Sequence, residues 1–99
     1  MTGLIYFDLK KERVLAGARW VQERDKWVST YELTKIRSTT VGLNRASKLT
    51  DAQGNTLVLV LRNAQMNPQL WNLVYNGIVH SVASGECDIS KAARRILKV

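Results

Sequence analysis

The spacing of apolar residues predicts a helix most clearly in NPQLWNLVYNGIVHSVASG, residues 67–85. Apolar side chains recur there every three or four positions, at Trp71, Val74, Tyr75, Ile78 and Val82. This spacing places them on one side of a helix, which is typical of an amphipathic helix that covers a core.

Both ends of this helix carry the expected signals. Asn67 is a favoured N-cap residue and Pro68 a favoured first helical residue. Gly85 stands where a left-handed C-terminal cap is expected. We therefore predict a helix over residues 67–84. Gly77 inside it costs about 1 kcal/mol relative to Ala, so we expect it to allow close packing against a sheet.

The middle of the chain has the composition of strands. WVSTYELTKIRSTTVGL is rich in β-branched and aromatic residues. In ASKLTDAQGNTLVLVLR, a DAQGN turn with positive φ at Gly54 and Asn55 should join antiparallel strands at residues 46–50 and 56–62. Residues 57–61 are apolar at every position, which predicts a central strand covered on both faces.

The first third of the chain is compatible with two structures. After a short strand at residues 4–7, Asp8 could cap a helix that runs to about residue 24, with Val14, Ala18 and Val21 on one face. Alternation of apolar residues through this stretch favours a hairpin instead. We take the helix as the first interpretation and keep the hairpin as the alternative.

A short basic helix is expected at the C-terminus, over about residues 89–98 after a cap at Asp88 or Ser90. Its inward-facing residues would be Ala92, Ala93, Ile96 and Leu97. Four cations fall on one side at i, i+3, i+4 and i+7, namely Lys91, Arg94, Arg95 and Lys98. With 99 residues, the chain fits one α+β domain: a small antiparallel sheet of about three to five strands, the helix at 67–84 and this basic helix.

One family resemblance follows from the order of these elements. YELTKI, a strand, KLTDAQGNTLVLVL and NPQLWNLVYNGI succeed one another between residues 31 and 80. This order resembles the second half of bacterial pleckstrin-homology-like domains, which pair strands through an Asp-x-x-Gly turn and close the sheet with an amphipathic helix. The resemblance implies an interaction module without fixing its ligand.

Composition narrows the class of protein. The chain is 45% hydrophobic and 23% charged, as in folded domains, and its longest apolar run, at residues 57–61, is too short to span a bilayer. The N-terminal sequence shows no secretory signal, and the lone Cys87 has no disulfide partner within the chain. We therefore expect a cytoplasmic protein.

Charge indicates the kind of partner. The net charge is +7, which favours nucleic acid or an acidic protein surface. Residues 33–50 contain no acid and are rich in hydroxyl side chains, and their cations are Lys35, Arg37, Arg45 and Lys48. These four, with the four of the C-terminal helix, are the candidate phosphate-binding residues. The alternative for the helix is a solvated outer face.

Motifs for catalysis or metal binding are not visible. His80 shares its helix face with Asn72 and Asn76 rather than with carboxylates, and Cys87 has no second cysteine for a metal site. We therefore expect no enzyme, metal or cofactor. We expect Trp71 in the core, and Trp20 and Trp27 partly buried unless one of them serves a protein contact or stacks on a base.

These observations favour a small basic non-enzymatic binding module associated with nucleic acid, similar in size and character to accessory proteins of phages and mobile elements. The alternative is a protein-interaction or assembly module with a pleckstrin-homology-like fold and no nucleic-acid role. Such a module could self-associate through an unpaired sheet edge or an exposed apolar patch.

Overall fold

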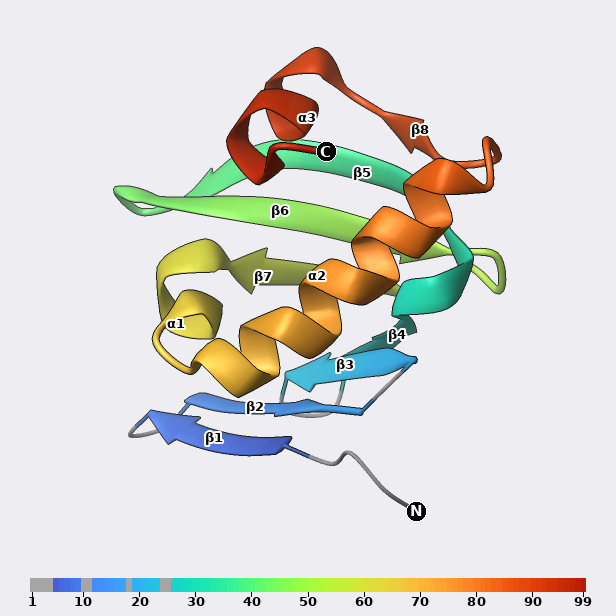
Figure 1. Cartoon of the computed structure of the whole chain (residues 1–99). Helices are drawn as coiled ribbons and strands as arrows, with labels where there is room; N and C mark the ends of the chain where they lie inside the picture. Colours follow the sequence, from blue (N-terminus) through green and yellow to red (C-terminus); the bar gives the residue numbers. More distant parts are fainter. Residues whose placement is uncertain (1–4, 10–11, 18, 24–25) are drawn as a thin grey trace.

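The α+β class is confirmed by the computed structural model, which describes residues 5–9, 12–17, 19–23 and 26–99. The chain forms two sheets, and the first lies below the second in the view of Figure 1. A long helix runs diagonally in front of them. A short helix at the C-terminus lies beside the edge of the second sheet.

The first sheet is an antiparallel meander of β1 (Ile5–Leu9), β2 (Glu12–Ala16), β3 (Trp20–Glu23) and β4 (Lys26–Ser29). The helix preferred for residues 9–24 is therefore wrong, and the alternating pattern was the correct signal. Ala16 pairs with Val21 across β2 and β3, and both side chains are fully buried. The chain turns between them at Gly17, whose N–H donates to the Trp20 carbonyl at 2.9 Å.

The second sheet consists of β5 (Leu33–Val41), β6 (Asn44–Asp51), β7 (Thr56–Val60) and β8 (Asp88–Ile89), in the order β7-β6-β5-β8. The predicted pairing across the DAQGN turn is confirmed, because β6 and β7 are antiparallel from Ala46↔Val60 to Thr50↔Thr56. The two-residue β8 adds in parallel to β5.

The expectation of a central strand at residues 57–61 is wrong. β7 ends the strand order of its sheet, and Leu61 already begins the short helix α1 (Leu61–Gln65). Leu57 and Leu59 face the core, whereas Val58 between them is only half-buried. The outer side of β7 lies close to β4 of the first sheet. The run is therefore apolar because two sheets meet there, not because helices cover both faces.

Helix α2 (Pro68–Ala83) confirms the firmest prediction. The Asn67 side chain accepts hydrogen bonds from the N–H groups of Gln69 and Leu70 at 3.1 and 3.2 Å, and Gly85 has a φ of +82°. In the described part of the chain, neither α2 nor any other helix has the length and apolarity needed to cross a bilayer.

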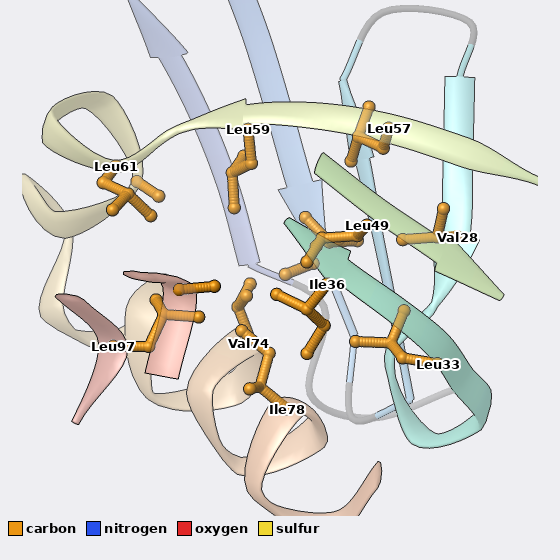
Figure 2. Close-up of a cluster of buried hydrophobic side chains, with 14 of the residues drawn as sticks. Val28, Leu33, Ile36, Leu49, Leu57, Leu59, Leu61, Val74, Ile78 and Leu97 are labelled. Carbon is orange, nitrogen blue, oxygen red and sulfur yellow. The ribbon is translucent and has the colours of Figure 1, made fainter. Parts of the chain in front are cut away.

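One core joins the two sheets to the helices. Figure 2 shows Ile36, Leu49 and Leu57 from the second sheet, Val28 from the first, and Val74 and Ile78 from α2 converging on it. The fully buried residues on α2 include Leu70, which the expected apolar face had omitted, while Trp71, Tyr75 and Val82 are only half-buried. The apolar face of α2 is therefore centred on Val74 and Ile78.

The C-terminal helix α3 (Lys91–Leu97) is also confirmed, with Ser90 as its N-cap. The Ser90 hydroxyl accepts from the Ala93 N–H at 3.1 Å. Ala93 and Leu97 are buried in the core, and Ile96 is half-buried. Ala92 was expected to face inward but is exposed, because α3 is only two turns long and contacts the molecule along a narrow stripe.

Gly77 allows a close approach, but to a different element than expected. It lies against Thr30 of the 3-10 turn η1 (Thr30–Glu32), not against a sheet, and a Cβ at this position would overlap the Thr30 side chain. Thr30 is completely buried, and its hydroxyl has no hydrogen-bond partner among the described residues. Backbone packing of α2 on η1 is therefore among the tightest contacts of the fold.

Asp51 connects the two sheets at the end of β6. One carboxylate oxygen accepts from the N–H groups of Gln53 and Asn55, and the other accepts from the Ser29 N–H at 3.0 Å and the Asn55 amide. Ser29 ends β4, so this carboxylate joins the first sheet to the turn of the second. Gly54 has the expected positive φ of +88°, but Asn55 does not, because its role in the turn is to bond Asp51.

The buried Asp51 carboxylate makes stability sensitive to acid. Burial alone would raise the pKa of Asp51, but hydrogen bonds from Ser29, Asn55 and Gln53 outweigh it and hold the pKa below the usual 3.8. Its contribution is therefore complete above the pKa of the unfolded chain and is lost as the pH falls through the lowered folded-state pKa.

We expect the free energy of unfolding of wild type to approach that of Asp51→Asn as the pH falls from about 6 to about 2.5. Urea unfolding followed by tryptophan fluorescence would measure both proteins at each pH. A constant difference across this range would contradict the proposed role of the ionised carboxylate.

Candidate functional site

Helix α3 presents three of the four predicted cations on an anchored support, and Lys98 follows them as its left-handed C-cap. Lys91, Arg94, Arg95 and Lys98 are all exposed, while Ala93 and Leu97 hold the helix in the core. The only bond that the structure describes for these four side chains is the 3.2 Å donation from the Arg94 guanidinium to the Val99 carbonyl. Among the described residues, no Asp or Glu carboxylate lies within ion-pair distance of them. The charged side chains that α3 itself contributes to this outer face are all positive.

A second group of cations lies on the outer face of the second sheet. Ile36 and Leu49 are paired and point into the core, so the next pair along, Arg37 and Lys48, points to the other face. Lys35 lies on this outer face as well, opposite Thr50. Two cations directly opposite each other on paired strands are destabilising unless an anion lies between them.

Arg37 already has an anionic partner. Its guanidinium contacts the Asp88 carboxylate at 2.6 Å and the Asp88 carbonyl at 2.7 Å, and so fastens β8 to the edge of β5. Both side chains are well exposed, so the pair adds little to stability. A phosphate would have to displace Asp88 to reach Arg37. Lys35 and Lys48 are therefore the more accessible of the predicted cations on this face.

Arg45 is separated from the other strand cations. It lies in an open groove of about 480 Å³ where the tip of the β5–β6 hairpin, α1 and α3 meet. The lining residues are Leu43, Asn44, Arg45, Leu61, Arg62, Gln65, Met66 and Ile96. The sequence reasoning missed Arg62 and the groove itself. No local spacing signals a site whose walls come from three separate segments.

An aromatic row crosses the surface near β3, β4 and η1. Trp27 is exposed and Trp20 half-buried, and both line a shallow hollow together with Arg19. The Arg19 guanidinium lies 5.2 Å from the centre of the Tyr31 ring, and Tyr31 stacks on His80 at 4.3 Å. Partial burial is thus confirmed for Trp20, and Trp27 is the exposed member of the pair.

His80 and Cys87 are not arranged for catalysis. His80 is exposed, and its ring is stacked on Tyr31 rather than hydrogen-bonded to a carboxylate among the described residues. Burial raises the pKa of the half-buried Cys87 thiol, and the neighbouring Asp88 carboxylate raises it further. A raised pKa disfavours the nucleophilic thiolate. In the ranges that the structure describes, His, Cys, Asp and Glu side chains form no group of three or more that could hold a metal ion.

No protein-family model, curated protein or solved structure matches this chain. Two surfaces of the molecule are chemically distinctive: the cationic outer face of α3, and the groove between the hairpin tip, α1 and α3. Lys35 and Lys48 point away from α3, because Ile36 and Leu49 beside them share the core with Ala93 and Leu97.

Proposed function

We propose that the protein is a small basic, non-enzymatic binding module that contacts the phosphate backbone of nucleic acid. The observation that carries this proposal is the outer face of α3 and its C-cap, where four exposed cations have no Asp or Glu partner in the described part of the chain. A face that serves only for solubility usually mixes both signs of charge. We propose that the protein acts in the cytoplasm. We also propose that it belongs with the small accessory proteins of phages or mobile elements.

Phosphate binding needs Lys and Arg side chains that are not already neutralised. In the described part of the chain, no Asp or Glu side chain pairs with the α3 cations or with Lys35 and Lys48 on the outer sheet face. Thr50 and Thr56 lie beside these lysines with their hydroxyls 3.5 Å apart, and such hydroxyls can donate to phosphate oxygens. Binding would release counterions and would therefore weaken steeply as salt is added. These cations and hydroxyl groups suit contacts with the phosphate backbone, which do not depend on the base sequence, rather than recognition of individual bases.

We expect fluorescence anisotropy with labelled single- and double-stranded oligonucleotides to show micromolar binding at low salt. The double variant Arg94→Ala/Arg95→Ala should weaken this binding by about tenfold and reduce its salt dependence, because two phosphate contacts are lost. The measurement is the dissociation constant of each protein across a salt series.

The control is Arg45→Ala/Arg62→Ala, which removes the same charge from the groove. It should weaken binding by no more than about twofold. If both double variants lose affinity equally, binding depends on net charge and not on α3. Flat curves for wild type at low salt would end the nucleic-acid proposal.

A protein-interaction module of the pleckstrin-homology-like type is the second candidate. Its support is the succession of a four-stranded meander, a three-stranded antiparallel meander and the closing helix α2. The second sheet also has an edge that another chain could extend: β8 pairs only with Lys35 and Ile36 of β5, and the part of β5 beyond them has no further strand partner within the described residues. Sedimentation velocity over a concentration series would detect self-association through this edge.

A further inference from the structure

The groove between the β5–β6 hairpin tip, α1 and α3 combines exposed apolar side chains with cations that have no ion-pair partner in the described ranges. Gly42 has a φ of +63° and makes a tight two-residue turn with Leu43, because Val41 and Asn44 are already paired. This turn holds the Leu43 side chain fully exposed. Met66, at the end of α1, is also more than half exposed.

The floor and rim of the groove differ in character. Leu61 is buried and Ile96 half-buried, so the floor is part of the anchored core. Arg45 and Arg62 are exposed at its rim and have no ion-pair partner among the described residues. The lining contains no acid and no aromatic residue. It is therefore a depression with apolar and polar walls in similar measure, and its charged side chains are all positive.

We propose that this groove docks an acidic amphipathic segment of a partner protein. Apolar side chains of the segment would pack against Leu43, Met66 and Ile96, and its carboxylates would pair with Arg45 and Arg62. Leucine, methionine and arginine together suit such a contact, because Met and Arg are enriched in interfaces and Arg binds carboxylates through two parallel hydrogen bonds. Asn44 and Gln65 supply amide groups for the backbone of the segment.

Charge complementarity separates this occupant from nucleic acid. The exposed apolar side chains of Leu43 and Met66 would find no apolar partner on a phosphate backbone, and no lining residue offers an aromatic ring on which a base could stack. A peptide with carboxylates beside apolar residues matches both the charge and the walls. This proposal is independent of the nucleic-acid proposal, because the two use different cations: Arg45 and Arg62 here, and Arg94 and Arg95 on α3.

The test is selection of binders to the full chain from a phage-displayed library of random peptides, followed by anisotropy with the enriched peptides. We expect the enriched sequences to share acidic residues next to apolar ones. Arg45→Gln and Arg62→Gln should each weaken their binding by about tenfold, and Leu43→Ser should weaken it similarly. These three side chains are exposed, so the variants should fold as wild type does.

The matched control is Arg94→Ala/Arg95→Ala, which removes two cations outside the groove and should leave peptide affinity within about twofold. The proposal is overturned if no peptide is enriched, if the enriched peptides lack acidic residues, or if the groove variants bind them as wild type does. Failure here would leave the oligonucleotide result unchanged, and loss of oligonucleotide binding in Arg94→Ala/Arg95→Ala would leave this result unchanged.

Two other occupants would also overturn the proposal. A dimer that Leu43→Ser converts to a monomer in sedimentation velocity would identify a second copy of the chain. Binding to phosphatidylserine vesicles that is lost in Leu43→Ser, without enrichment of acidic peptides, would identify a lipid surface.

Discussion

Asp51→Ala should lower the free energy of unfolding by about 3 kcal/mol, a large part of the stability of a small domain. The substitution leaves the donors of Ser29, Gln53 and Asn55 without their shared acceptor. Asp51 is only 2% exposed, so water cannot replace the carboxylate freely. The loss would also separate the end of β4 from the turn after β6. Urea unfolding followed by tryptophan fluorescence would measure it.

Asp88→Ala is the matched control, because it removes an aspartate whose partner is the Arg37 guanidinium at the surface and not a set of buried N–H groups. Asp88 contacts Arg37 at 2.6 Å, yet its side chain is 70% exposed. Its removal should cost less than about 1 kcal/mol. Asp51→Asn should fall between the two, since one amide oxygen can still accept but the amide nitrogen would face the Ser29 donor. Equal losses for Asp51→Ala and Asp88→Ala would show that burial and shared hydrogen bonding do not decide the effect.

Local signals explain why the C-terminal half could be predicted. The N-cap of α2 requires a side-chain acceptor at Asn67, and its C-terminal end requires the positive φ of Gly85. The turn after β6 requires Gly54 for the same backbone reason. Each of these caps and turns depends on residues within a few positions of one another. A short stretch of sequence is therefore enough to predict it.

The first third could not be assigned in this way because two periodicities coincide there. Val14, Ala18 and Val21 fit a helical face, while Ala16 and Val21 face each other across two strands in the structure. Only pairing with β4 and packing against α2 select the strands, and neither is visible locally. Gly17 was the overlooked signal, since the Trp20 ring covers it and leaves no space for a Cβ.

In the candidate sites, too, features that depend on neighbouring residues could be predicted from the sequence, and features that depend on strand pairing could not. The four C-terminal cations are all exposed, three of them on α3 and Lys98 at its left-handed C-cap, because their spacing follows one short helix up to its end. The four strand cations were grouped by their proximity in sequence, but strand pairing places Lys35, Arg37 and Lys48 on the outer sheet face and Arg45 in the groove. Asp88 then neutralises Arg37 from a distant segment. Sequence reveals which charges are present, and pairing decides which of them act together.

Gly77→Ala should destabilise the protein by about 2 kcal/mol, although Ala is the better helix former by about 1 kcal/mol. The added Cβ would overlap the side chain of Thr30 and come within 3.1 Å of its carbonyl carbon. Thr30 cannot withdraw easily, because its N–H donates to the Arg19 carbonyl and its own carbonyl accepts from the Ser81 hydroxyl at 2.6 Å. Helix α2 would have to move away from η1 and loosen the core beneath it.

A double-mutant cycle with Thr30→Gly tests this cause directly. Thr30→Gly removes both side-chain atoms that the new Cβ would meet, so adding Gly77→Ala to it should cost clearly less than adding it to wild type. Asn76→Ala, at an exposed position of the same helix, should be neutral or slightly stabilising. If the effects of Thr30→Gly and Gly77→Ala simply add, contact between α2 and η1 is not what requires glycine. A coupling free energy of about 1 kcal/mol or more between the two substitutions would show that contact with Thr30 is the reason for glycine at position 77.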